Sequence, residues 1–350
     1  MAGLALAAVA LLLAWLATPM GRYLARGAWE EARILARRRP IAAMVADTAT
    51  DARTRARLQL VLDARRFAVD SIGLPARESF TTYSRLDADT LVLVLSAAYR
   101  DRLESVTWWF PVVGRVPYKG YFDFDDARAA ADDFRTRGYD VYLRPAAAFS
   151  TLGWFNDPLL STTLRQDTLN LAGTVIHELT HNRFYAPGQA VFNESFANFV
   201  GARGAAWFFR QRGQESAASR VDQSWADEKV LAAFWAQLHT TLDSAYAAHP
   251  SDSSARVSAR ERVYARARQQ LVDSLAPVLP SVSARWFETV ALDNAALLAR
   301  RIYLTDLDIY DEVWEREGRD LRATLARLIG LAESRPDDPF GAVRGWLGGT

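Results

Sequence analysis

The chain of 350 residues contains no cysteine, only four histidines, and lysine only as Lys119 and Lys229. Without cysteine it has no disulfide bond and no lipid anchor attached to a cysteine. The absence of cysteine does not indicate whether the protein works in an oxidising or a reducing compartment. It also lacks an excess of charge of one sign, because 42 basic residues face 41 acidic ones. Nothing therefore indicates a nucleic-acid partner. Half of the residues are hydrophobic and no internal repeat is present, so the chain can form one large catalytic unit or two lobes.

Two of the four histidines stand in one short motif, His177-Glu178-Leu179-Thr180-His181, which has the pattern HExxH. On a helix, residues four apart are separated by about 40° around the axis, so both imidazoles project from one face. Zinc is commonly bound by two such side chains and a third ligand, with one position left for water. Glu178 then stands where it could accept a proton from that water. The motif predicts a metallohydrolase; the alternative is two surface histidines on an amphipathic helix.

The residues around this motif predict the helix that carries it. Asp167 is of a type that caps helix N-termini, and Pro187-Gly188 marks the end of the helix. Apolar residues recur between them at helical spacing: Leu171, Val175, Ile176 and Leu179. We expect them to anchor the back of the helix in the core, because metal ligands must be held rigidly.

A third ligand is expected close downstream. The arrangement HExxHxxGxxH is excluded, because Phe184 and Pro187 occupy the positions of its glycine and third histidine. Asn193 is instead predicted to cap a second helix and to place Glu194 in its first turn, where the helix dipole favours the ionised carboxylate. A short turn would fold this helix back antiparallel, bringing Glu194 to the histidines, and Asn198 could orient a ligand from behind. The alternative for Glu194 is an ordinary acidic residue.

Several segments resemble a bacterial family of zinc aminopeptidases. The resemblance is carried by the HELTH motif, by Phe192–Ala197 after it and by Ser150–Thr162 before it. Further matching segments lie outside this block: Arg66–Ala68, Gly73–Pro75, Phe110–Gly114, Tyr118–Phe122, Asn294-Ala295 and Tyr303. The similarity extends from about Tyr23 to Leu331, nearly the whole chain. One departure is that many members look like lipoproteins with a cysteine to acylate, and this chain has none.

The resemblance also implies a site and a chemistry. The family is similar to the gluzincins, the thermolysin-like enzymes that bind zinc through two histidines and one glutamate. It implies that His177, His181 and Glu194 are the ligands of one zinc ion, Zn²⁺, and that Glu178 is the catalytic base. It also implies a peptide as the substrate.

The amino-terminal segment bears on location. Residues 2–17 are almost wholly apolar, and no charged side chain occurs before Arg22. This length suits a signal-peptide core and is slightly short of the roughly 20 residues of a membrane span. Arginines 37–39 follow it, which argues against a simple anchor with its N-terminus inside. We expect residues 1–21 to be a signal or anchor segment, with membrane association through residues 2–18 or export to the bacterial cell envelope, as the resemblance suggests.

Hydrophobic patterning predicts an α+β protein with a small mixed sheet ahead of a helical part. The expected helices are 22–38, 51–72 and 125–136, and the expected strands are 90–95, 108–110, 118–122 and 139–143. Everything beyond Asp167 reads as helical, with breaks at Pro250, Pro280 and Pro336. This order is the plan of a zincin, so we expect an α/β lobe over residues 22–165 and a helical catalytic lobe with the zinc site over residues 166–350.

The segment before the metal helix is a candidate for contact with substrate. In thermolysin-like enzymes an edge strand beside the zinc pairs with the substrate backbone. Residues 149–155 are expected to play this role, because Ser150 and Gly153 are small enough for close backbone approach. Together with Trp154 they are the candidate substrate-binding residues. The alternative is a structural loop that packs Trp154 and Phe155 into the core.

The tetrahedral oxyanion of peptide hydrolysis needs a hydrogen-bond donor besides zinc. Tyr303, Tyr310 and His239 are candidates on the later helices, and Tyr303 is preferred because the resemblance reaches it. For each of them the alternative is a packed aromatic ring without a catalytic role.

The sequence leaves two enzymatic functions to consider and two non-catalytic alternatives. An aminopeptidase needs a carboxylate for the ammonium group of its substrate, and Asp157, Glu104 and Asp293 are equal candidates. An endopeptidase would use the same site without such a group. A non-catalytic, membrane-associated scaffold has no need of Glu178, and a purely structural zinc site would have four protein ligands.

Overall fold

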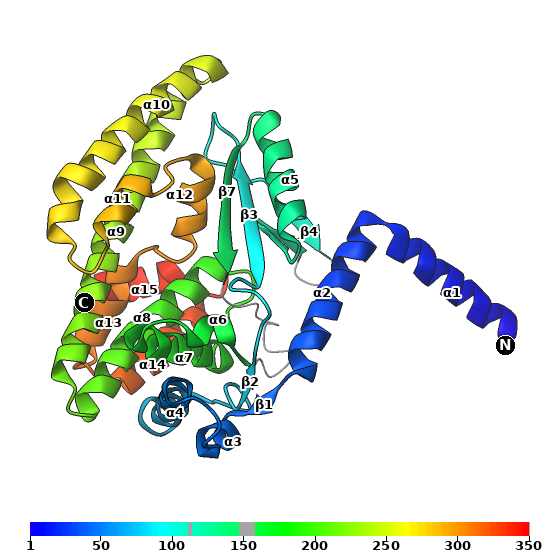
Figure 1. Ribbon diagram of the computed structural model, residues 1–350. Coiled ribbons are helices and arrows are strands. Elements are labelled where there is room, and N and C mark those ends of the chain that lie inside the picture. Colours follow the sequence, from blue (N-terminus) through cyan, green and yellow to red (C-terminus); the bar gives the residue numbers. More distant parts are fainter. Residues whose placement is uncertain (111–113, 147–157, 350) are drawn as a thin grey trace.

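The computed structural model describes residues 1–110, 114–146 and 158–349, which are mostly helical with three small sheets (Figure 1). The α+β class expected from the sequence is therefore confirmed at the level of a mixed, mainly helical chain. The strands belong to the first part of the chain, and β8 is the last of them.

The chain begins with two consecutive helices, α1 (Ala2–Ala17) and α2 (Pro19–Ala36). Thr18 separates them, and its hydroxyl oxygen accepts a hydrogen bond from the Gly21 amide at 3.0 Å while Pro19 occupies the first position of α2. In Figure 1, α1 extends away from the rest of the protein. Among the described residues, no helix has the length and apolarity that crossing a membrane requires. Membrane association and location in the cell envelope stay predictions.

A small sheet with strand order β1-β2-β8 lies beside the next two helices. Its strands are β1 (Arg39–Pro40), β2 (Thr82–Ser84) and β8 (Leu159–Leu160), and the helices are α3 (Ile41–Ala46) and α4 (Ala52–Phe67). β2 pairs antiparallel with β1 and parallel with β8. The helix expected from residue 51 is confirmed: Asp51 caps α4, a π-helical turn (Ala68–Ile72) continues it, and Gly73 ends it with a φ of 84°.

The main sheet is antiparallel, with strand order β6-β3-β7. It consists of β3 (Val92–Ala98), β6 (Lys119–Tyr121) and β7 (Asp140–Ala146), and α5 (Phe124–Thr136) packs on it. β4 (Trp108–Phe110) and β5 (Gly114–Val116) form a separate hairpin. The strand expected at 90–95 is β3, which begins two residues later and ends three residues later, and it is almost wholly buried, as its continuous apolar run predicts.

The rest of the described chain is helical, as expected. These helices are α6 (Ser161–Leu164), α7 (Thr168–Arg183), α8 (Ala190–Gln211), α9 (Glu215–Ala247), α10 (Ser253–Gln270), α11 (Ala284–Thr289), α12 (Asn294–Arg301), α13 (Leu307–Arg316), α14 (Leu321–Ser334) and α15 (Pro339–Gly348). A π turn (Leu271–Leu275) and a 3-10 turn (Ala276–Val278) follow α10. The breaks predicted at Pro250, Pro280 and Pro336 all lie between helices.

The largest hydrophobic core surrounds α7, which packs against α4 and α8. Aromatic rings of α8 stack there on Tyr310 of α13, as in the Phe199–Tyr310 pair at 5.7 Å. This core contains side chains from both sides of the lobe boundary expected at residue 165, for example Leu58 and Leu171. The division into lobes at that residue stays a prediction.

A buried carboxylate joins the main sheet to the helical part. Asp140, at the start of β7, accepts hydrogen bonds from the Arg260 guanidinium at 2.6 Å and from the Asn294 backbone amide at 2.9 Å. The Asn294 side chain accepts hydrogen bonds from the hydroxyls of Tyr246 and Tyr264. The buried charge of Asp140 is thus paired and hydrogen-bonded, and β7, α10 and α12 are held together at one point.

α7 and α8 approach each other closely at glycine positions. A Cβ atom on Gly201 of α8 would lie 3.0 Å from the Gly173 carbonyl oxygen and 3.2 Å from the His177 Cβ of α7. The absence of a side chain at Gly201 therefore sets the distance between the helix that carries His177 and its neighbour.

We expect Gly201→Val to lower the free energy of unfolding by about 1–3 kcal/mol, because the added methyls overlap the backbone of α7. Chemical denaturation measures the change. Gly330→Val is the matched control, since a Cβ there, on the exposed face of α14, meets nothing within 4 Å. Equal stability of the two variants would contradict this account of the contact.

Candidate metal centre

Two neighbouring antiparallel helices bring three metal-ligating side chains together. His177 and His181 project from α7, and Glu194 projects from α8. The Nε2 atoms of the two histidines are 3.3 Å apart. Glu194 Oε2 lies 3.5 Å from His177 Nε2, and Glu194 Oε1 lies 3.8 Å from His181 Nε2. The structure thus brings together the three residues that the sequence analysis singles out as metal ligands.

The local sequence explains why α7 holds its histidines in place. The Asp167 carboxylate accepts hydrogen bonds from the amides of Leu169 and Asn170, so it caps the helix as predicted. The apolar residues on the opposite face are all buried: Leu171, Val175, Ile176 and Leu179. The helix ends at Arg183, before the expected terminator Pro187-Gly188, because Phe184 is already extended.

The prediction that Asn193 caps the second helix is wrong. α8 begins at Ala190, so Asn193 lies one turn inside it and Glu194 stands beyond the first turn. The Asn193 side chain instead reaches back to Ala186, accepting from its amide and donating to its carbonyl oxygen, both at 2.8 Å. It stabilises the turn between the helices, and this contact, not the helix dipole, accounts for the position of Glu194.

The spacing of the three ligand atoms fits a tetrahedral metal site. Two ligands with metal bonds of about 2.0–2.1 Å at tetrahedral angles lie about 3.3 Å apart. The two histidine nitrogens are 3.3 Å apart, and they lie 3.5 and 3.8 Å from different oxygens of the Glu194 carboxylate, which are separations near this value. With one ligand atom taken from each residue, all three atoms lie within 4.8 Å of one another. The site can therefore hold a metal ion with small adjustments of the side chains, and three protein ligands leave a coordination position open.

The electrostatics of the three groups are coupled. Burial lowers the pKa of His177, but the hydrogen bond with Glu194 and the charges of Glu178 and Glu194 outweigh it, so the pKa is raised. Burial and the charge of His177 lower the pKa of His181. Burial favours the neutral form of Glu194, yet its hydrogen bond with His177 and the charges of both histidines lower its pKa. Glu194 is thus held ionised, as a metal ligand must be.

Asn198 lies one turn beyond Glu194 and contacts both a ligand and the rim of the site. Its side chain makes a hydrogen bond with His177, and its Nδ2 donates to the Tyr303 carbonyl oxygen at 3.0 Å. It therefore stands where the sequence analysis expects a residue that orients a ligand. Glu178 is partly buried beside the ligands, and its charge acts on both histidines.

Tyr303, Tyr118 and Arg144 interact electrostatically with Glu194, and together they are called the rim of the site. Tyr303 lies in the connection between α12 and α13, and the Arg144 guanidinium is 5.8 Å from its ring centre. Burial and the charge of Glu194 raise the pKa of both Tyr303 and Tyr118. The sequence analysis missed Arg144, which the end of β7 supplies without any local signal. Tyr118 lies in a segment of the family resemblance, which could have indicated it.

Five further candidate residues are not found at the site in the part of the chain that the structure describes. Ser150, Gly153, Trp154 and Asp157 lie outside the described residues. Tyr310 is fully buried among the rings of the core, which suits packing.

Two of the carboxylates considered for the substrate's ammonium group have structural partners, and His239 lies on α9. Glu104 is exposed and paired with Arg102 at 2.8 Å. Asp293 caps α12 by accepting from the Ala296 amide at 2.8 Å. His239 is partly buried, and its pKa is lowered by burial and by the charge of Arg301.

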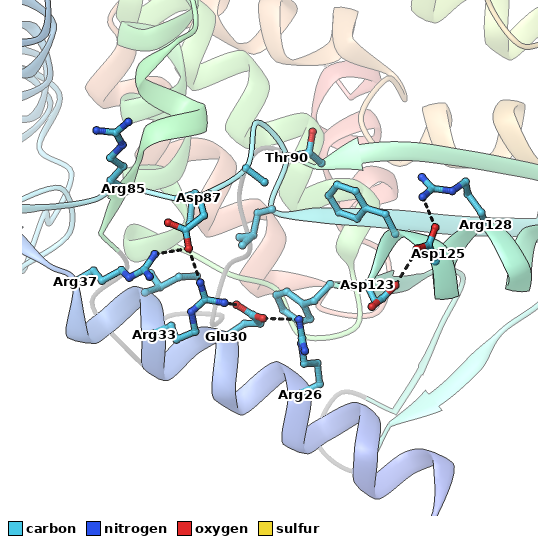
Figure 2. Close-up of a pocket in the computed structure, with 16 residues that line it drawn as sticks. Arg26, Glu30, Arg33, Arg37, Arg85, Asp87, Thr90, Asp123, Asp125 and Arg128 are labelled. Carbon is cyan, nitrogen blue, oxygen red and sulfur yellow. Dashed lines mark hydrogen bonds and ion pairs between the residues drawn. The ribbon is translucent and has the colours of Figure 1, made fainter.

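A hollow of about 460 Å³ lies elsewhere, between α2 and the segment that leads into β3 (Figure 2). Its charged side chains pair with one another, for instance Asp87 with Arg33 at 2.6 Å and with Arg37 at 2.8 Å. Arg26 likewise pairs with Glu30 at 2.9 Å. Since most of these charges are paired and, among the described residues, no metal-ligand set lines this hollow, the histidine pair marks the better candidate for chemistry.

We expect the chain to bind one divalent metal ion, and His177→Ala and Glu194→Gln each to abolish stoichiometric binding by removing one of three ligands. Metal analysis after dialysis measures the content. His239→Ala, which removes a histidine on α9, is the control and keeps the metal. Full metal content in either ligand variant would contradict the site.

Metal affinity is expected to fall as the pH decreases through the raised pKa of His177. A proton on this imidazole competes with the metal, and its raised pKa keeps it protonated to a higher pH than an ordinary histidine. Affinity is therefore complete above that pKa and lost below it. Calorimetric titration in buffers of different ionisation enthalpy should find about one proton released near neutral pH. Affinity that does not change from alkaline to acidic pH would refute the competition.

The comparison with known protein families covers nearly all of this architecture. Residues 22–338 match the family described as "Putative aminopeptidase", a range that includes α7, α8 and the rim of the site. No match was found among curated proteins or solved structures. The resemblance to an aminopeptidase family is thereby confirmed over the range in which the sequence analysis places it. With its match over most of its length, the chain belongs to the Putative aminopeptidase family.

Proposed function

We propose that the chain is a zinc-dependent aminopeptidase, a gluzincin-like enzyme in which His177, His181 and Glu194 bind one zinc ion. The observation that carries the proposal is the set of three ligand atoms within 4.8 Å of one another, with the glutamate of the HExxH motif beside it. Two imidazole nitrogens and one carboxylate oxygen are donors that zinc prefers in catalytic sites. The family match supports a peptidase, and the donor set supports zinc.

Zinc bound there would lower the pKa of a water molecule and polarise the scissile carbonyl of a peptide. Glu178 accepts the proton of the attacking water and delivers it to the leaving amine. The Tyr303 hydroxyl donates a hydrogen bond to the developing oxyanion, and its raised pKa keeps it protonated for this role. Asn198 holds His177 in the ligating orientation.

Two other functions use the same residues differently. An endopeptidase would cleave within a chain by the same steps and would ignore the state of the substrate's amino terminus. A non-catalytic scaffold would use the fold to bind partners and would not hydrolyse peptides. Glu178 favours catalysis over the scaffold, because a binding module has no need of a general base beside the ligands.

We expect Glu178→Gln to retain zinc while hydrolysis falls by about 10²–10⁴-fold, because the amide cannot accept the proton of the water. Digestion of a peptide library, with zinc and after chelation, measures activity, metal dependence and the position of cleavage together. Glu215→Gln, at the exposed start of α9, is the matched control. Unchanged hydrolysis in the Glu178 variant would refute the general base, and activity that survives chelation would refute the metal.

A further inference from the structure

One side of α9 carries a regular buried stripe. Successive positions of the stripe are three or four residues apart in the sequence. This spacing places them on one face of the helix, as in a face that packs against other helices. Its buried members are Ala218, Val221, Trp225, Ala232, Trp235, Leu242 and Tyr246. Glu228 and His239 occupy the remaining positions of the same stripe. α9 packs against α8, so this stripe turns towards the helix that carries Glu194.

Glu228 differs from its neighbours in the stripe because its side chain reaches solvent. Trp225, one turn before it, and Ala232, one turn after it, are 2% and 6% exposed, whereas Glu228 is an exposed residue. A side chain at a core-facing position can be accessible only where the packing opens. Glu228 is exposed, yet surrounding protein atoms desolvate its carboxylate, which is the combination expected of a side chain in a recess between helices.

The Phe199–Trp225 ring pair at 6.1 Å fixes the register of α8 against α9. Because these two helices run antiparallel, Glu228, one turn after Trp225, lies level with the part of α8 that carries Glu194. Its charge interacts with that of His177.

Glu228 also lacks a structural partner. Within the described part of the chain, its carboxylate has no hydrogen bond and no ion pair, and the surrounding protein atoms raise its pKa to about 7, with the charge of His177 opposing the rise. The two charged residues next to it in α9, Asp227 and Lys229, both have partners within the protein. Asp227 accepts from the Ser281 amide at 2.9 Å, and Lys229 pairs with Asp311 at 2.7 Å. An unpaired carboxylate in a recess indicates a cationic ligand.

We propose that Glu228 binds the α-ammonium group of the peptide substrate and thereby restricts cleavage to a free amino terminus. This assignment rests on the proposed zinc peptidase function and names the group that makes it an aminopeptidase. Glu104 and Asp293 are engaged elsewhere, whereas Glu228 stands beside the ligand set without a partner. A carboxylate and an ammonium form a charge-assisted hydrogen bond, which is stronger where protein atoms surround the pair than in open water.

The charges around the site support a directional substrate. Arg144, from β7, acts on Glu194 and Tyr303, and Glu228, from α9, acts on His177. Glu228 attracts a substrate ammonium and Arg144 repels it. The ammonium is therefore expected to bind at the Glu228 end of the site. Glu228 touches the substrate but not the scissile bond, and its role is specificity.

The test is the binding of leucine hydroxamate and its N-acetyl derivative to the zinc-loaded protein, measured by calorimetry. Both compounds ligate zinc, and only the first offers an ammonium group. We expect the wild type to prefer the free amine by about ten- to hundredfold. Glu228→Gln should lose this preference while its affinity for the acetylated compound and its zinc content stay unchanged. Asp243→Asn, which neutralises an exposed carboxylate on the same helix, should keep the preference.

The outcomes separate this inference from the function on which it rests. If the wild type binds both hydroxamates with zinc and shows no preference, or if Glu228→Gln retains the preference, the role of Glu228 is refuted while the zinc site stands. If Glu228→Gln weakens both compounds equally, the residue is structural and the inference is again refuted. If the wild type binds neither zinc nor hydroxamate, the proposed function itself fails, and the inference fails with it.

Discussion

The close contact between α7 and α8 is the constraint on which the rest of the site depends. Gly201 allows the backbone of α8 to lie against the Gly173 carbonyl oxygen and the His177 Cβ, and the Asn193 side chain closes the turn between the helices at Ala186. The Glu194 carboxylate therefore lies 3.5 Å from His177 Nε2, and the packing of two helices sets this distance. Ligands on packed helices are held within small tolerances, which is what a metal with fixed bond lengths requires.

The site concentrates negative charge. Glu178 and Glu194, which both follow His177 in the sequence, act on it from α7 and α8, and the charge of His177 acts on Glu228 of α9. The charges of Glu178 and Glu194 raise the pKa of His177, whereas burial raises the pKa of Glu228 and the charge of His177 opposes that rise. A divalent ion and a substrate ammonium would both offset this charge. The negative charge of the site therefore favours both metal binding and amine recognition, although different residues contact the metal and the amine.

Local patterns predicted the metal helix well and long-range contacts poorly. The spacing of His177 and His181, the cap at Asp167 and the apolar back of α7 depend only on helix periodicity, and all are found in the structure. The cap assigned to Asn193 failed because its amide satisfies the preceding turn from inside α8. Arg144 was missed because it reaches Glu194 from a strand some fifty residues earlier in the chain, and such a contact has no local signature. The glutamate in the apolar stripe of α9 was visible in the periodicity and was overlooked.

The buried carboxylate of Asp140 connects two parts of the rim that do not touch the metal. It sits at the start of β7, which ends in the region of Arg144, and it binds the first residue of α12, the helix that leads to Tyr303. A change at Asp140 would thus act on both rim residues, and the hydrogen bond from Asn198 to the Tyr303 carbonyl oxygen would transmit it to α8. The position of the rim therefore depends on a carboxylate that contacts neither the metal ligands nor the rim side chains.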